Sequence, residues 1–256
     1  NFNGNTFANN ALKKGAYKVI IDEKEFLNDH SILVHNVLET LQELATFHRN
    51  YLKIPIIALT GSNGKTTTKE LINAVLSKKY KTVATKGNLN NHIGVPLTLL
   101  AMNSNTEIGI VEMGANHHKE IELLCEITKP DYGYITNFGK AHLEGFGSLE
   151  GVIEAKTEMY RYLKSKKSTV FINFNDKKQR NHSEGINKYT FGGEGQDCTI
   201  KLVDTSNEVL ISYQNTTIQS HLIGHYNYTN IAASIVDSRF AVAYGVICTL
   251  AILLTM

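Results

Sequence analysis

The sequence predicts an α/β fold: a P-loop-type central domain with a mostly parallel sheet and a small antiparallel sheet, preceded by part of an α/β N-terminal domain. Three observations predict it. An apolar strand pattern at residues 56–60 runs into a glycine loop and then into a helical pattern from Thr66. Apolar strand and helix patterns continue to alternate through residue 173, as in parallel sheets with crossover helices. Residues 188–223 show short segments with alternating faces, which are typical of antiparallel strands.

The N-terminal part, residues 1–52, is expected to contain a helix at residues 7–14, a strand at 17–21 and a longer helix at 32–50. A unit of this size buries little core of its own, so we interpret it as the back part of a domain. The chain does not begin with methionine, and we expect its start to be cut.

The central domain is assigned to residues 53–236. Its remaining helices are expected beyond Pro96, at residues 118–127 and 149–164, and from about Tyr226. Its strands are expected at residues 56–60, 80–84, 108–111, 132–136 and 170–173, followed by the antiparallel set at 189–191, 199–203, 209–213 and 217–222.

Residues 237–256 are left unassigned, and within them residues 240–254 are almost wholly apolar. This stretch is shorter than the roughly 20 residues of a membrane span. It is either a buried helix, a membrane tail, or a sequence foreign to this fold.

The composition indicates an ordinary globular protein. Hydrophobic residues make up 42% and charged residues 20% of the chain, which excludes wholesale disorder. A net charge of +2 argues against a nucleic-acid binder. The three cysteines match no metal or disulfide spacing, and residues 1–30 show no pattern that can be read as an export signal, so we expect reduced, packed thiols in a cytoplasmic protein.

The segment 60–68 predicts a phosphate-binding loop. Gly61 and Gly64 allow backbone N–H groups to converge on an anion, Lys65 adds a positive charge, and Thr66 offers a hydroxyl to Mg²⁺. The loop is a shortened form of the Walker pattern, because Leu59 stands where that pattern has glycine. The alternative is a chance strand, turn and helix with a lysine.

Four further positions suggest chemistry. Glu112 ends an apolar strand, where it either shares Mg²⁺ with Thr66 or is simply exposed. Lys156 falls on the inward face of a helix; it either extends its amine to the surface or, when desolvated, takes up CO₂ as a carbamate that binds metal. His142 follows another strand end and is either structural or a ligand.

Asn88 and Asn91 occupy one loop, and they either bind substrate or cap a turn.

Taken together, the motifs of this chain resemble the Mur ligase family. The resemblance covers roughly residues 1–236. The motifs stand in family order at residues 60–67 (TGSNGKTT), 85–96 (TKGNLNNHIGVP), 112–115 (EMGA), 136–144 (TNFGKAHLE), 155–158 (AKTE) and 224–233 (GHYNYTNIAA).

The resemblance implies an ATP-dependent ligase that joins D-alanyl-D-alanine to UDP-N-acetylmuramoyl-tripeptide through an acyl phosphate, with ATP and two Mg²⁺ ions. It implies that Thr66 and Glu112 bind one Mg²⁺, and that His142 and carbamylated Lys156 bind the second near Glu112. It places Asn88 and Asn91 at the UDP-linked substrate. The residues implied to bind ATP are Gly61, Ser62, Asn63, Gly64, Lys65, Thr66, Thr67 and Asn230.

By the same resemblance, residues 1–52 are a partial UDP-substrate-binding domain and the C-terminal ligase domain is missing. Because that domain is missing, we expect the chain to be inactive or weakly active. We also expect a monomer that binds no nucleic acid. Two alternatives remain: a folylpolyglutamate synthase-like ligase, and an ATP-binding module or pseudoenzyme.

Overall fold

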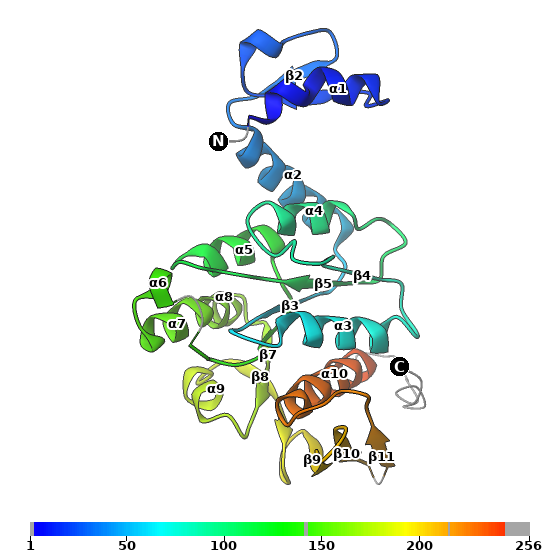
Figure 1. The fold of residues 1–256 in the computed structure, drawn as a ribbon, viewed down its shortest axis with the longest axis vertical. Coiled ribbons are helices and arrows are strands. Elements are labelled where there is room, and N and C mark those ends of the chain that lie inside the picture. The colour runs from blue at the N-terminus through cyan, green and yellow to red at the C-terminus, as the bar shows by residue number, and fades with distance from the viewer. Residues whose placement is uncertain (1–2, 141–142, 215, 244–256) are drawn as a thin grey trace.

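The computed structural model describes residues 3–140, 143–214 and 216–243. Within these residues a nine-stranded sheet has helices on both faces, and a smaller N-terminal unit is joined to it through the long helix α2 (Figure 1). The predicted α/β class is confirmed.

The sheet has the strand order β11-β10-β9-β8-β7-β6-β3-β5-β4. All pairings from β4 to β9 are parallel, whereas β10 is antiparallel to both of its neighbours. The strands are β3 (Ile56–Thr60), β4 (Thr82–Ala84), β5 (Ile108–Glu112), β6 (Tyr132–Ile135), β7 (Thr169–Asn173), β8 (Asn187–Gly192), β9 (Cys198–Asp204), β10 (Leu210–Tyr213) and β11 (Thr216–Gln219).

The expected antiparallel pairing of residues 189–191 is wrong, because β8 pairs in parallel with both β7 and β9. The missed feature is α9 (Lys177–His182), which crosses from β7 to β8 and so allows them to run in the same direction. Only Gln179 of this helix is buried, so its sequence has no apolar periodicity to reveal it. The antiparallel strands also extend the main sheet and do not form a separate one.

The core consists of two hydrophobic layers, one on each face of the sheet. Because side chains alternate along a strand, Ile56 and Ala58 of β3 enter one layer, whereas Ile57 and Leu59 enter the other. The first layer includes residues of α4 (Gly94–Leu100), α5 (Glu120–Thr128), α7 (Leu149–Lys156) and α8 (Glu158–Ser165). The second includes α3 (Lys65–Leu76) and α10 (Tyr226–Ala243), which pack side by side (Figure 1).

The N-terminal unit contains two parallel strands, β1 (Val19–Ile21) and β2 (Ser31–Leu33). Its helical segments are η1 (Gly4–Phe7), α1 (Ala8–Lys13), η2 (Lys24–Phe26) and α2 (Val37–Leu52). The prediction that residues 32–34 are helical is wrong. The Asn36 side chain accepts hydrogen bonds from the N–H groups of Leu38 and Glu39, and this cap fixes the helix start at Val37.

Helix α2 holds the unit against the sheet through Arg49, which is only 8% exposed. Its guanidinium donates to the carbonyls of Thr128 and Lys129, each at 3.0 Å, and to Asp131 at 2.8 Å. Asp131 in turn accepts the N–H of Ile56, the first residue of β3, at 2.8 Å. We call this set of Arg49 and Asp131 hydrogen bonds the Arg49 clamp.

Three other expectations have mixed outcomes. The predicted helix at residues 149–164 is two helices separated at Thr157, and the short α6 (Leu143–Phe146) precedes them. Cys125 and Cys198 are free and buried, as expected, whereas Cys248 lies outside the described residues.

Helix α10 continues past residue 237 to Ala243, and the rest of the apolar tail also lies outside the described residues. No helix in the described part combines the length and apolarity needed to cross a bilayer.

Candidate functional site

The site begins with the order of three strands. β6, β3 and β5 are adjacent and parallel, so their carboxyl ends lie at one edge of the sheet. The predicted phosphate loop follows β3, Glu112 ends β5, and Asn137 follows β6. The sequence prediction that these segments meet is confirmed.

The loop after β3 leads into an open helix N-terminus. Gly64 precedes α3 with a φ of 75°, and no described side chain caps the helix there. The first N–H groups of a helix have no intrahelical acceptor. Together with the helix dipole they form a site that attracts anions, and Lys65 stands at its first position.

Contacts from the β6 end hold this loop in shape. The Thr136 hydroxyl donates to the Asn63 carbonyl at 2.6 Å, and the Asn137 amide donates to the same oxygen at 2.9 Å. Asn137 also accepts the Asn63 N–H at 3.1 Å. Gly61 has a φ of 145°, and any side chain there would collide with the Thr136 hydroxyl.

Ser62, a predicted ATP-binding residue, uses its hydroxyl within the protein. The hydroxyl donates to the Gly139 carbonyl and accepts the Gly139 N–H, both at 3.0 Å. The loop is therefore fixed from two positions on the segment after β6.

The Lys65 amine lies within the loop. It donates to the Gly61 carbonyl at 2.9 Å and more weakly to the Ser62 carbonyl at 3.4 Å. Burial lowers the pKa of Lys65, and the charge of Glu112 offsets part of that shift. The second effect shows that the amine lies within electrostatic range of the carboxylate at the end of β5.

Glu112 carries the unsatisfied charge of the site. It is 1% exposed, and its Oε1 accepts the Asn90 amide at 2.8 Å and faces the Thr66 hydroxyl at 3.4 Å. Its Oε2 is buried without a hydrogen-bond partner among the described residues. A buried carboxylate oxygen of this kind is costly unless a cation meets it. Glu112 and Thr66 therefore fit a divalent cation that prefers oxygen ligands.

Lys156 is buried as predicted, with 2% exposure. Its amine lies 3.4 Å from the Ala115 carbonyl, three residues beyond Glu112, and 5.5 Å from the centre of the Phe146 ring. Burial and, to a lesser extent, the positive charge of Lys65 together lower the pKa of Lys156 to about 8. The alternative in which the amine reaches the surface is wrong.

The other predicted residues have different surroundings. Asn91 caps the turn before α4, since its Oδ1 accepts the N–H groups of Ile93 and Gly94 at 3.1 and 2.9 Å. Asn88 is exposed. His142 lies outside the described residues, and within the described ones no three His, Cys, Asp or Glu side chains gather as a metal site. The second metal set expected from His142 and carbamylated Lys156 therefore stays a prediction.

Asn230 lies on α10 and is buried against the start of α3. Its Oδ1 accepts the Thr68 hydroxyl at 3.1 Å, and its amide donates to Asn227 at 2.9 Å. A Cβ on Gly64 would come within 2.8 Å of Asn230 Oδ1, so the two residues touch.

Three residues of the site were missed from sequence: Asn90, Thr85 and Lys69. Asn90 holds Glu112 directly, and its signal was its place between Asn88 and Asn91 in the quoted motif. Thr85 accepts the Glu112 N–H at 3.0 Å, and Lys69 donates to the Thr85 carbonyl at 2.7 Å. No sequence pattern revealed the last two contacts.

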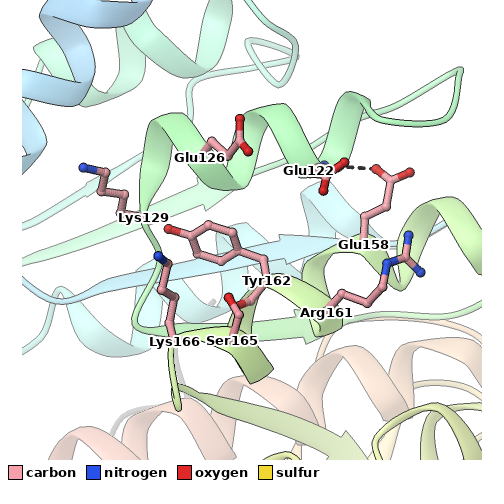
Figure 2. Close-up of a pocket in the computed structure, with 8 residues that line it drawn as sticks. All are labelled: Glu122, Glu126, Lys129, Glu158, Arg161, Tyr162, Ser165 and Lys166. Carbon is pink, nitrogen blue, oxygen red and sulfur yellow. Dashed lines mark hydrogen bonds between the residues drawn. The ribbon is translucent and has the colours of Figure 1, made fainter.

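A separate pocket of about 430 Å³ lies between α5 and α8 and contains none of these strand-end residues (Figure 2). Its buried member, Glu158, accepts the N–H groups of Lys119 and Glu122 at 2.7 and 3.0 Å. Glu158 thus caps the start of α5, and this role accounts for the buried carboxylate. The lining residues are Glu122, Glu126, Lys129, Glu158, Arg161, Tyr162, Ser165 and Lys166.

Comparison with known proteins gives consistent matches. The family described as "Mur ligase middle domain" matches residues 59–237. The UDP-N-acetylmuramoyl-tripeptide–D-alanyl-D-alanine ligase of Bacillus subtilis is 38% identical over 93% of this chain and 53% of its own length.

Solved structures agree. The MurF ligase of Thermotoga maritima, in complex with ADP, has a TM-score of 0.82 at 31% identity and covers 99% of this chain and 60% of its own. MurF from Acinetobacter baumannii has a TM-score of 0.80 at 30% identity, over 97% of this chain and 55% of its own. The chain thus spans about half the length of these relatives. Motifs, strand order and these matches together show that the chain belongs to the Mur ligase family.

Proposed function

We propose that this chain supplies the ATP- and Mg²⁺-binding centre of a ligase that adds D-alanyl-D-alanine to UDP-N-acetylmuramoyl-tripeptide. It would act in the cytoplasm as a monomer. The names of its relatives support the substrates, and the strand-end site supports the nucleotide and the metal.

One observation carries this proposal. The Thr66 hydroxyl faces a buried Glu112 whose second oxygen has no partner in the described structure, beside an uncapped helix N-terminus. The helix end and Lys65 attract phosphate, and Thr66 and Glu112 attract a divalent cation. These are the two requirements of Mg²⁺-bound ATP.

The residues then have distinct tasks. The first N–H groups of α3 and Lys65 bind and orient the phosphates, and Thr66 with Glu112 would hold Mg²⁺. Bound there, Mg²⁺ would neutralise charge on the phosphate oxygens. Lys65 adds positive charge where the substrate carboxylate attacks the terminal phosphate of ATP, which breaks the bond to the bridging oxygen, releases ADP and forms an acyl phosphate. The amine of D-alanyl-D-alanine then attacks the acyl carbon and releases phosphate.

We further propose that Lys156 takes up CO₂ and, with His142, binds a second Mg²⁺. Its burial and lowered pKa support a reactive neutral amine. Asn88 and Asn91 are proposed to face the UDP-linked substrate, and Asn230 to lie beside the adenine. The capping role of Asn91 leaves its amide nitrogen for such a contact.

The first test is nucleotide binding by the chain itself, measured by calorimetry. ADP affinity should rise on adding Mg²⁺ to the natural sequence, and Glu112→Gln should remove at least about tenfold of that gain. Glu107→Gln is the control, since Glu107 lies before the same strand. Equal Mg²⁺ gains in all three proteins contradict the assignment.

Ligation is tested in a protein extended to the length of its relatives. ADP release should require both UDP-N-acetylmuramoyl-tripeptide and D-alanyl-D-alanine, with the joined product identified by mass spectrometry. Turnover with folate and glutamate would establish the folylpolyglutamate alternative. Nucleotide binding without any turnover would establish a pseudoenzyme.

A further inference from the structure

Lys69 is a fully buried lysine that the proposed chemistry does not use. It lies on α3, is 0% exposed, and donates to the Thr85 carbonyl at 2.7 Å. Its second partner is the neighbouring Glu70 carboxylate at 2.6 Å, whose side chain is 60% exposed. A buried ammonium group is costly unless hydrogen-bond acceptors meet it, and these two contacts supply such acceptors.

Thr85 connects this lysine to the candidate metal ligand. Its carbonyl accepts from Lys69, whereas its hydroxyl accepts the backbone N–H of Glu112 at 3.0 Å. Its own N–H donates to the Ile110 carbonyl at 3.0 Å. Thr85 therefore connects the end of β4 to the last residue of β5 and, through Lys69, to α3.

Lys69 and Thr66 lie three residues apart on α3 and so project from neighbouring positions of one helix face. Thr66 faces the Glu112 carboxylate at 3.4 Å, while Lys69 reaches the residue that holds the Glu112 backbone. The contacts form a closed ring of Thr66, Lys69, Thr85 and Glu112.

We propose that Lys69 is a positioning residue that sets the spacing between the Thr66 hydroxyl and the Glu112 carboxylate, and hence the fit of the metal. This rests on the proposed Mg²⁺-nucleotide function. A methionine would fill a similar volume but leave the Thr85 carbonyl unpaired, so α3 and β4 would lose their fixed separation. An arginine could restore a donor but would not reproduce the same reach.

The test compares Lys69→Met, Lys69→Arg and Thr85→Val, with Lys78→Met as a matched control because Lys78 is exposed just after the same helix. One readout is the gain in ADP affinity on adding Mg²⁺, measured beside the metal-free affinity. The other is hydrogen exchange at the Glu112 amide without nucleotide or metal.

Lys69→Met and Thr85→Val should each reduce the Mg²⁺ gain by about tenfold and speed Glu112 amide exchange by about tenfold, with metal-free ADP affinity changed less than about twofold. Lys69→Arg should recover part of the gain. The double variant Lys69→Met/Thr85→Val should lose no more of the gain than the more impaired of the two single variants.

An unchanged Mg²⁺ gain together with unchanged Glu112 exchange in Lys69→Met overturns the proposal. A loss of ADP affinity that is the same with and without Mg²⁺ also overturns it. If Lys69→Met does not fold, Thr85→Val decides by the same criteria. A natural chain that gains nothing from Mg²⁺ refutes the proposed function instead, and the exchange readout then tests the ring of contacts by itself.

Discussion

Lys156 places an amine inside the protein, and both its burial and the positive charge of Lys65 favour the neutral form of that amine. At pH 7 a pKa of about 8 leaves about a tenth of the amines neutral, far more than for a lysine in water. Because CO₂ reacts only with the neutral amine, the fraction available to form carbamate should rise as pH increases from 7 to 9.

This gives the first prediction. With carbon-13-labelled bicarbonate, NMR should show a carbamate signal that grows over that pH range and is lost in Lys156→Met. Lys119 supplies a contrast within the chain, since hydrogen bonding to Glu122 raises the pKa of its exposed amine. A signal that persists in Lys156→Met assigns the carbamate to another amine.

Gly61 gives the second prediction at this scale. Gly61→Ala should destabilise the protein by about 1–3 kcal/mol, because the backbone has a φ of 145° and the new methyl group meets Thr136. ADP affinity should fall as the loop shifts. Thermal unfolding and calorimetry measure both effects. Gly193→Ala is the matched control, since a Cβ there meets nothing within 4 Å; a similar loss in that variant contradicts the steric explanation.

The site residues that could be predicted best from the sequence are those that lie at or just after the carboxyl ends of strands. Thr66 and Glu112 could be paired because parallel strands bring their carboxyl ends together. The contacts of Lys69, Thr85 and Asn90 could not be predicted from the sequence, because they depend on the path of the loop between β4 and α4. Burial of Lys156 followed from helical periodicity, but the Ala115 and Phe146 contacts did not.

At the scale of elements, Glu158 links two helices. Its carboxylate accepts two N–H groups at the start of α5 while its backbone begins α8 (Figure 2). It therefore fixes the position of one helix relative to the other. The same residue is the last of the AKTE segment that contains Lys156, so the cap also restrains the end of α7.

The third prediction follows from this cap. Glu158→Gln should lower the free energy of unfolding by about 1–2 kcal/mol, because an amide accepts these N–H groups with one oxygen and without charge. Chemical denaturation measures the change. Glu126→Gln, at an exposed position of the same pocket, is the control. Equal small effects in both variants contradict the capping role.

The two elements that sequence patterns misplaced were misplaced for different reasons. The Asn36 cap delayed the start of α2, and polar α9 left no apolar stripe to detect. By contrast β3 was located residue for residue, because its five positions are buried on both faces and read as one apolar run.

At the scale of the whole molecule, the relation of the N-terminal unit to the sheet depends on α2. Arg49 makes three hydrogen bonds to the last residue of α5 and the segment that joins it to β6, and Asp131 extends that contact to β3. The junction is therefore specified by a planar guanidinium rather than by apolar area alone.

The fourth prediction tests this junction. Arg49→Lys should destabilise the protein by about 2–4 kcal/mol, since a lysine cannot make the same forked contacts and leaves buried carbonyls unpaired. Limited proteolysis should then cut near residue 53 sooner than in the natural chain. Lys53→Arg, at the exposed residue that ends α2, is the control. Unaltered proteolysis in Arg49→Lys contradicts the clamp.

Cys125 and Cys198 are buried in opposite hydrophobic layers, and burial raises the pKa of the Cys125 thiol well above its usual range. Neither sulfur is available to an alkylating reagent until its own side of the sheet opens. With Cys248 replaced by serine, the order in which the two thiols are alkylated during unfolding would report which layer separates first. The chain thus contains a built-in pair of reporters, with no foreign label required.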